Sequence, residues 1–352
     1  MKNVFAITGL SLALLTGCGQ HFVAQQSTVE EGTVKKNTDS SKISPGKIWL
    51  DDNGEVINAH GGGVIFQQGK YYWFGEKRGR FASEGVNVYS SSDLYNWKLE
   101  AMALSQDKND TLSDIARGCV MERPKVLYNE KTKKFVLWFH LELRGKGYSA
   151  ARAAVAVSDN VTGPYKYISS FRPNGNMSRD MTLYKDDNGD AYIIYSSREN
   201  YDLRIAKLTD DFLSVTTADT MLFSNHREAP AIFKYNNIYH LITSGCTGWK
   251  SNKATLHTAT NLFGPWTESK INPMSGPQAD ITFDGQSTFV LPVAGKKDQF
   301  IFLADKWNPG NLKDSRYLWL PIQFKNETPV VEWMDEWRLG WFENNLKKGN
   351  NN

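Results

Sequence analysis

The chain has 352 residues, of which 40% are hydrophobic and 12% aromatic, and it carries 41 Lys and Arg against 38 Asp and Glu. This length fits one to three domains and is ample for a buried core. The formal charge of +3 is small and no run of Lys or Arg stands out, so the composition indicates neither nucleic acid nor an anionic membrane surface as a partner.

The first residues have the pattern of an export signal. Met1-Lys2 precedes an apolar run from Val4 to Leu15, which is too short to span a membrane. The run ends in Leu15-Thr16-Gly17-Cys18, which resembles a bacterial lipobox. We expect residues 1–18 to be a lipoprotein signal peptide with Cys18 as the lipidated residue, the alternative being an ordinary signal with a chance cysteine. Lipidation would anchor the protein in the bacterial cell envelope, in the periplasm or at the outer-membrane surface.

Residues 19–44 are rich in Gln, Ser, Thr, Lys and Glu and contain hardly an aromatic. Such a composition cannot bury enough apolar surface to fold, which predicts a flexible tether.

Five later segments share one plan, a pair of short β-prone runs joined by a polar turn. In the fourth of them, residues 231–233 and 239–243 flank Asn236-Asn237, a step that suits a tight turn. The other four cover residues 63–76, 124–140, 181–195 and 287–303. A second pair of strands is expected after each hairpin, so the unit recurs every ~50–60 residues. Five such units predict an all-β fold, a single five-bladed β-propeller over residues 45–345.

The residues just before each hairpin are the main functional signal of the sequence. In a propeller the innermost strands converge on one axial depression, so these positions become neighbours despite their distance in sequence. They are His60, Glu122, Asp180, Glu228 and Gln286. Three carboxylates and an amide at one depression predict a site for acid–base chemistry.

Neighbouring residues predict different environments for these side chains. Ala229 and Pro230 follow Glu228, and apolar surroundings should raise the pKa of its carboxyl, as a general acid working near neutral pH requires. Arg179 precedes Asp180 and should keep that carboxylate ionised. His60 is followed by three glycines, which admit close approach of backbone or ligand, and it is either a ligand-facing hydrogen bonder or a core histidine.

Two cysteines remain once Cys18 is assigned to the anchor. Cys119 and Cys246 lie in different predicted blades, and two unpaired thiols are favoured over a disulfide. No cluster of His and Cys has metal-ligand spacing, so neither a metal nor a cofactor is expected.

Carboxylates across an aromatic-lined axial pocket are what cleavage of a glycosidic bond requires. One carboxyl protonates the leaving oxygen, and a second group orients or activates a water molecule. Carboxylates on different blades would leave room for that water, which favours inversion and a separation of roughly 6.5–9.5 Å.

Several phrases together resemble glycoside hydrolase family 43, and more closely its exo-β-1,3-galactanase branch. They are Ala59-His-Gly-Gly-Gly, Glu122-Arg-Pro-Lys, Ser178-Arg-Asp-Met, Glu228-Ala-Pro-Ala, Ser244-Gly-Cys-Thr-Gly-Trp and Gly285-Gln-Ser-Thr. The resemblance covers roughly residues 46–335 and involves all five blades in order. It implies an inverting, exo-acting enzyme that releases galactose from the β-1,3-galactan backbone of arabinogalactan. We expect the protein to be a monomer.

The resemblance also implies roles for single residues. Glu228 matches the general acid, and Asp180 matches the carboxylate that orients this acid and tunes its pKa. The aspartate base usual in the family is absent at Asn58-Ala59-His60-Gly61. In the galactanase branch, the amide matching Gln286 positions the water and the acid matching Glu122 binds substrate. Because an amide is a poor base, Glu122 stays an alternative base.

Further positions resemble sugar contacts of that branch: Glu76, Tyr148, Thr247 and Trp249. Two alternatives to the galactanase remain. One is a β-xylosidase or α-L-arabinofuranosidase of the same family. The other is a non-catalytic glycan-binding lipoprotein, which loss of the base could have produced.

Overall fold

The structure is a computed structural model, and it describes residues 41–79 and 82–344. The predicted signal peptide, Cys18 and most of the predicted tether lie outside the described residues. Within the described ranges, no helix is long and apolar enough to cross a membrane.

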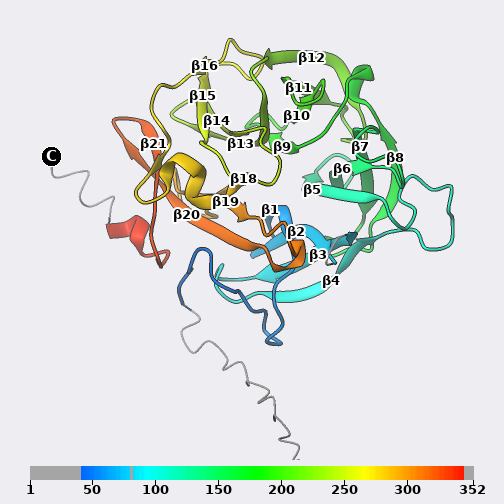
Figure 1. Cartoon of the computed structure of the whole chain (residues 1–352), viewed down its shortest axis with the longest axis horizontal. Helices are drawn as coiled ribbons and strands as arrows, with labels where there is room; N and C mark the ends of the chain where they lie inside the picture. The colour runs from blue at the N-terminus through cyan, green and yellow to red at the C-terminus, as the bar shows by residue number, and fades with distance from the viewer. Residues whose placement is uncertain (1–40, 80–81, 345–352) are drawn as a thin grey trace, which may run out of the picture. The chain divides into compact units, whose positions relative to one another are not determined.

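Five antiparallel sheets surround a common axis and form the predicted five-bladed β-propeller (Figure 1). The first two blades contain β1 (His60–Gln67), β2 (Lys70–Arg78), β3 (Ser83–Ser91) and β4 (Lys98–Ser105), then β5 (Val120–Asn129), β6 (Lys134–Glu142), β7 (Arg152–Ser158) and β8 (Lys166–Phe171). The third and fourth contain β9 (Met181–Lys185), β10 (Ala191–Ser197), β11 (Asp202–Leu208) and β12 (Val215–Phe223), then β13 (Arg227–Tyr235), β14 (Ile238–Gly245), β15 (Thr255–Ala259) and β16 (Thr267–Glu268). The fifth contains β18 (Gln286–Pro292), β19 (Phe300–Lys306), β20 (Arg316–Lys325) and β21 (Thr328–Glu332).

The fifth blade differs from the expectation by one strand. The short β17 (Met274–Ser275) pairs in parallel with β21, which makes this sheet five-stranded. Three 3₁₀ segments, η1 (Pro173–Gly175), η2 (Ala279–Asp284) and η3 (Leu312–Asp314), and a single helical turn at residues 341–344 complete the described elements. A two-residue strand has no alternation of side chains to detect, so the sequence pattern could not predict β17.

The ring is closed by segments outside the blades. Every blade is built from one contiguous stretch of chain, so no sheet joins the two ends of the propeller. Instead, Ile43 and Trp337 exchange two backbone hydrogen bonds of 2.8 and 2.9 Å. Trp337 is buried, and Trp333 and Trp341 pack against the same core.

Tryptophans pack between the first and the fifth blade. The ring of Trp73 on β2 lies 4.8 Å from that of Trp319 on β20 and 5.3 Å from that of Trp97. All three are almost fully buried. This seam joins the first blade to the fifth, and aromatic pairs of this kind add to the free energy gained by burial alone.

The innermost strands are irregular where the site begins. Register shifts occur in β1 after His60, in β5 after Glu122 and in β13 after Glu228. The following residues have positive φ: 60° at Gly61, 55° at Arg123 and 53° at Ala229. A bulge bends the strand and re-aims a side chain, so the start of each of these strands can turn a residue toward the axis.

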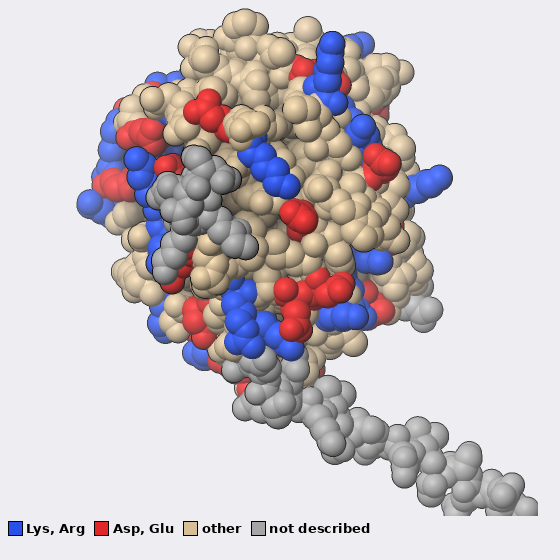
Figure 2. Space-filling view, turned by 90° about the vertical axis from the view of Figure 1, so that its left-hand side faces the viewer, with Lys and Arg blue, Asp and Glu red and all other residues tan. Residues whose placement is uncertain are grey.

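Charges are interspersed on the side of the molecule drawn in Figure 2. Basic and acidic side chains lie among each other there, without a broad area of one sign. This distribution agrees with the small formal charge and offers no wide basic surface on that side for nucleic acid.

Candidate active site

A cavity of about 330 Å³ lies where the five inner strands converge. Ligand cavities usually measure roughly 300–1,000 Å³, so this one is at the small end of the range. Its lining residues come from all five blades: Gly61, Glu76, Arg78, Glu122, Arg123, His140, Tyr148, Arg179, Asp180, Asn200, Glu228, Gly248, Trp249, Gln286 and Trp307.

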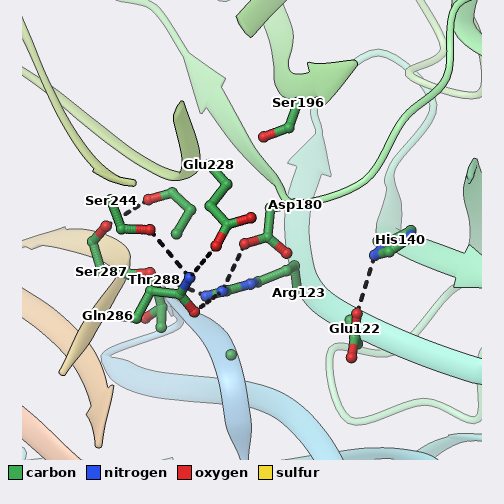
Figure 3. A network of polar contacts seen from close by, with 12 residues as sticks. Glu122, Arg123, His140, Asp180, Ser196, Glu228, Ser244, Gln286, Ser287 and Thr288 are labelled. Carbon is green, nitrogen blue, oxygen red and sulfur yellow. Dashed lines mark hydrogen bonds and ion pairs between the residues drawn. The ribbon is translucent and has the colours of Figure 1, made fainter. Parts of the chain in front are cut away.

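One polar network joins Asp180, Glu228 and Gln286, which come from three different blades (Figure 3). Arg123 Nη2 donates to Asp180 Oδ2 over 2.7 Å and to Gln286 Oε1 over 2.5 Å. Gln286 Nε2 donates to Glu228 Oε1 over 2.9 Å, and Asn200 Nδ2 donates to Glu228 Oε2 over the same distance. The two carboxylates are therefore linked through a guanidinium and an amide rather than by direct contact.

Glu228 has the protonation behaviour of a general acid. Burial and the nearby negative charge of Asp180 raise the pKa of its carboxyl to about 8, against the opposing effects of Arg123, Cys246 and Gln286. At neutral pH the carboxyl therefore holds a proton that it can donate. This agrees with the expectation drawn from its apolar neighbours.

Glu122 lies in a second group of polar side chains. Arg78 Nη2 and the Tyr148 hydroxyl donate to Glu122 Oε1 over 2.7 and 2.8 Å. His140 Nδ1 lies 3.2 Å from Glu122 Oε2, and its Nε2 lies 2.8 Å from Glu142 Oε1. Both glutamates and His140 are buried.

These contacts fix the charges in the second group. Burial alone would raise the pKa of Glu122, but the hydrogen bond to His140 and the positive charge of Arg78 hold it well below its usual range. Burial likewise disfavours the imidazolium, yet hydrogen bonds to Glu122 and Glu142 raise the pKa of His140 to about 9. Glu122 is thus a permanent anion: a good hydrogen-bond acceptor and a weak proton acceptor.

Glu76 reaches the cavity from β2 and is fully buried. Arg78 Nε lies 2.8 Å from Glu76 Oε2. Burial raises the pKa of Glu76 to about 8; Arg78 opposes this shift, and the negative charge of Glu122 adds to it. Since one guanidinium serves both carboxylates and Glu122 takes the charge, Glu76 carries a proton at neutral pH.

The structure brings most of the residues predicted from sequence to this cavity. Glu76, Glu122, Tyr148, Asp180, Glu228, Trp249 and Gln286 all line it. His60 does not: its side chain is 0% exposed, stacks on Tyr317 and has Nδ1 3.6 Å from Asp305 Oδ1. That placement agrees with the alternative of a core histidine.

Thr247 also stays outside the cavity lining. Its hydroxyl donates to the Lys250 carbonyl and accepts from Asn252 Nδ2 over 2.7 Å. These contacts close the turn after β14, so the hydroxyl has a local structural partner on each side. Trp249 in the same turn is 41% exposed and faces the cavity rim.

Asp180 pairs with a different arginine from the one that its sequence neighbour predicted. Arg179 pairs with Glu199 and donates to the Tyr148 carbonyl, whereas Arg123 pairs with Asp180. Consecutive side chains in extended backbone point to opposite sides, so a charged neighbour in sequence is seldom the partner in space. The expected ion pair of Asp180 exists, but with a residue from another blade.

Several site residues carried no signal of their own in the sequence. Arg78 lies on the outgoing strand of a hairpin, Asn200 follows β10 at a φ of 64°, and Trp307 follows β19. Their shared feature is a place at, or shortly after, the end of the second strand of a blade. This is the same end of the blade as the residue before the first strand. A search of those positions would have found all three.

One possible metal cluster occurs among the described residues. One atom each of Glu122, His140 and Asp180 lie within 4.8 Å of one another. The guanidinium groups of Arg78 and Arg123 pair with these carboxylates and would repel a divalent cation. The donor set therefore fits a hydrogen-bonded substrate better than a metal.

The two cysteines that the structure describes are free thiols. Cys119 is buried away from the cavity. Burial and the neighbouring Glu228 raise the pKa of Cys246 to about 12, so its thiol is protonated and unreactive at neutral pH.

A protonated carboxyl, two ionised carboxylates and tryptophans around a small axial cavity define a glycoside hydrolase. The model of the family "Glycosyl hydrolases family 43" matches residues 62–329. The chain belongs to this family.

Solved structures of the family resemble this chain over most of its length. A β-1,3-galactosidase solved with galactodeoxynojirimycin is 48% identical, with a TM-score of 0.82 over 84% of this chain and 100% of that one. An exo-β-1,3-galactanase from Phanerochaete chrysosporium, solved with β-1,3-galactotriose, is 34% identical, with a TM-score of 0.79 over 85% of this chain and 68% of that one.

A more distant relative has a different activity. A xylan 1,3-β-xylosidase from Vibrio sp is 24% identical over 203 residues, which are 54% of this chain and 37% of that protein. This chain thus spans little more than a third of the length of that relative.

Proposed function

We propose that the protein is an exo-acting, inverting glycoside hydrolase that releases galactose from the β-1,3-galactan backbone of arabinogalactan. The observation that carries the proposal is the buried carboxyl of Glu228, whose pKa is raised to about 8 and which is linked to Asp180 through Gln286 and Arg123 in one small axial cavity. The β-1,3-galactosidase and exo-β-1,3-galactanase among the similar structures supply the substrate class.

In this proposal the reaction is a single displacement. The proton of Glu228 passes to the glycosidic oxygen as its bond to the anomeric carbon breaks, and a water oxygen bonds to the opposite face of that carbon. That water gives up one proton, to the Glu122 carboxylate in one assignment and to solvent where Gln286 only positions the water. Asp180 keeps the pKa of Glu228 high. Glu122 accepts hydrogen bonds from sugar hydroxyls, Glu76 donates one, and the indole of Trp249 packs on an apolar sugar face.

Product analysis of β-1,3-galactan tests the proposal, with the anomeric configuration followed by NMR. Galactose released as the α-anomer is the expected result; the β-anomer would contradict inversion. If activity survives Gln286→Ala but is lost in Glu122→Gln, Glu122 is the group that takes the proton of the water. If activity survives Glu122→Gln but is lost in Gln286→Ala, Gln286 is the group that positions the water.

A pentosidase is the second candidate, and the Vibrio xylosidase favours it. Release of pentose from aryl xylosides or arabinofuranosides, without release of galactose from galactan, would establish that activity. Binding of galactan without any release of reducing sugar would instead identify a glycan-binding protein.

The cellular setting is part of the same proposal. The lipobox-like phrase ending in Cys18 supports export and lipid anchoring in the cell envelope, with the propeller acting as a monomer. The tether expected over residues 19–44 must end before Ile43, because Ile43 is buried and pairs with Trp337. Cys18→Ser should release the protein from membranes of the producing cell, and sedimentation of the purified protein should give one propeller per particle.

A further inference from the structure

The side-chain amide of Gln286 has all of its hydrogen-bonding capacity in use. An amide oxygen has two lone pairs and an amide nitrogen has two hydrogens. Oε1 accepts from Arg123 Nη2 over 2.5 Å and from Trp307 Nε1 over 2.9 Å. Nε2 donates to Glu228 Oε1 over 2.9 Å and to Ser244 Oγ over 3.1 Å. Gln286 therefore meets neither water nor substrate without losing one of these bonds.

Two of the four partners decide which way the amide points. A guanidinium and an indole N–H can only donate, whereas a carboxyl and a hydroxyl can do either. Arg123 Nη2 carries two hydrogens, and it donates one to Gln286 and the other to Asp180 over 2.7 Å. The indole Nε1 of Trp307 has one hydrogen, and it is given to Gln286 alone.

Packing holds the indole in place. The ring of Trp307 lies 5.4 Å from that of Trp249, and the guanidinium carbons of Arg78 and Arg123 lie 5.7 and 5.8 Å from its centroid. The side chain is thus fixed by an aromatic neighbour and two cations rather than by the hydrogen bond itself.

We propose that Trp307 is a positioning residue for the reaction: its indole N–H fixes the Gln286 amide with the NH2 group turned toward the general acid Glu228. This proposal rests on the role given to Glu228 above. In this orientation Gln286 acts on the acid by donating to its carboxylate form, and it has no free lone pair with which to receive a proton from water.

The consequence for Glu228 has a definite sign. Its carboxyl faces Asp180, which raises its pKa. Three further groups lower this pKa: Arg123, Cys246 and Gln286. Asn200 also donates a hydrogen bond to the carboxyl, and Arg227 precedes Glu228 in β13. When Trp307 no longer holds the amide, Arg123 is the one remaining donor-only partner that opposes a turn of the Gln286 oxygen toward the carboxyl. When the amide turns, the carboxylate form loses a donor, and the pKa of Glu228 rises.

The test compares Trp307→Phe with the wild-type protein in a ¹³C-carboxyl NMR titration, with Glu228→Gln identifying the resonance. We expect the titration of Glu228 to move up by about half to one pH unit, the effect of one neutral hydrogen bond. The alkaline limb of kcat/KM on β-1,3-galactobiose should move by the same amount. Unchanged titration in a folded Trp307→Phe protein would overturn the proposal.

Trp249→Phe is the matched control, since Trp249 lies against Trp307 and lines the same cavity but makes no hydrogen bond to Gln286. Trp249→Phe should change KM and leave the titration of Glu228 unchanged. If the titration of Glu228 shifted equally in Trp249→Phe and Trp307→Phe, Trp307 would have only a packing role. In a Gln286→Ala background, Trp307→Phe should add no further shift.

A second measurement does not depend on the stability of Trp307→Phe. In the wild-type protein, hydrogen exchange at the Trp307 indole should be slow, and Gln286→Ala should accelerate it. Equal exchange rates would contradict the bond. If the wild-type protein released no galactose, the proposed function would fail, while the titration and the exchange would still report on Trp307.

Discussion

The imidazole of His140 and the carboxylate of Glu142 form a buried pair, with Nε2 and Oε1 2.8 Å apart. The other oxygen of Glu142 accepts from the backbone N–H of Ala151 over 3.0 Å. Because both carboxylate oxygens of Glu142 have a partner, this residue keeps His140 charged and directed at Glu122, which would bind the sugar. Glu142 does not line the cavity, but it sets the charge and orientation of His140, which does.

Glu142→Gln tests this relationship. An amide can still accept from Ala151 N–H, but it offers His140 an NH2 group, which suits a neutral imidazole. The pKa of His140, raised to about 9 in the wild type, should fall toward its ordinary value near ~6.5. We expect KM on β-1,3-galactobiose to rise about three- to tenfold between pH 7 and 9 and to approach the wild-type value below pH ~6, where His140 regains its proton. A KM increase that is independent of pH would contradict the mechanism.

Removal of the acid should affect kcat far more than binding. Glu228→Gln keeps the size of the side chain and its bond to Asn200 or Gln286 but has no proton to donate. We expect kcat on β-1,3-galactan to fall about 10²- to 10⁴-fold, the usual contribution of general acid catalysis. An aryl galactoside with an acidic leaving group should be affected much less, and equal losses on both substrates would argue against this role.

Asp180 should set the alkaline limit of activity through its charge. The acid must be protonated to act, so activity is present below the pKa of Glu228, about 8, and is lost as pH rises through it. Asp180→Asn removes the negative charge that raises this pKa and leaves Arg123, which lowers it. The alkaline limb of kcat/KM should therefore move to lower pH by about one unit or more. If the alkaline limb of kcat/KM stays at the same pH in Asp180→Asn, or moves to higher pH, this charge effect is excluded.

Glu76 should act as a hydrogen-bond donor at neutral pH, because burial raises its pKa to about 8. Glu76→Gln retains a donor of the same shape, whereas Glu76→Ala removes it and takes from Arg78 one of its two carboxyl partners. We expect kcat/KM at pH 7 to fall by less than about tenfold in the first variant and by about 10²-fold or more in the second. Equal losses would mean that the carboxylate form is needed.

The sequence predicted which positions meet at the axis but not how they are connected. Repetition of the hairpins was enough to place Glu122, Asp180, Glu228 and Gln286 at one cavity, because the propeller itself imposes that convergence. The partner of Asp180 was not predictable from its neighbours, since it comes from another blade through the bulge at Arg123. Bulges and left-handed residues depend on tertiary contacts, and local sequence carries little information on them.

His60 shows that an equivalent position in the sequence pattern does not guarantee a place in the cavity lining. Its position before a hairpin is equivalent to that of Glu228, yet it packs on Tyr317 and is fully buried. The backbone bulges in the same way after both residues, with a φ of 60° at Gly61 and 53° at Ala229, so the difference lies in the side-chain contacts. The imidazole of His60 is held between Tyr317 and Asp305, and close packing of Gly62 against the backbone of β2 fixes the strand there.

Gly75 on β2 permits this close approach, and it gives the last prediction. A Cβ at Gly75 would lie 2.0 Å from the carbonyl carbon and 2.2 Å from the oxygen of Ala59. These are backbone atoms and cannot rotate away, so Gly75→Ala must displace the segment that leads to His60 and Gly61. We expect a loss of at least about 3 kcal/mol in the free energy of unfolding, measured with denaturant, because backbone clashes exceed ordinary overpacking.

Gly340→Ala is the matched control for Gly75→Ala, since a Cβ at Gly340 would have no heavy atom within 4 Å and the residue has no positive φ. It should change the free energy of unfolding by less than about 0.5 kcal/mol. Any Gly75→Ala protein that folds should also have a lower kcat/KM, because Gly61 lines the cavity. Equal stability of the two variants would mean that the first blade tolerates separation of its two inner strands, and the floor of the site would then not depend on their contact.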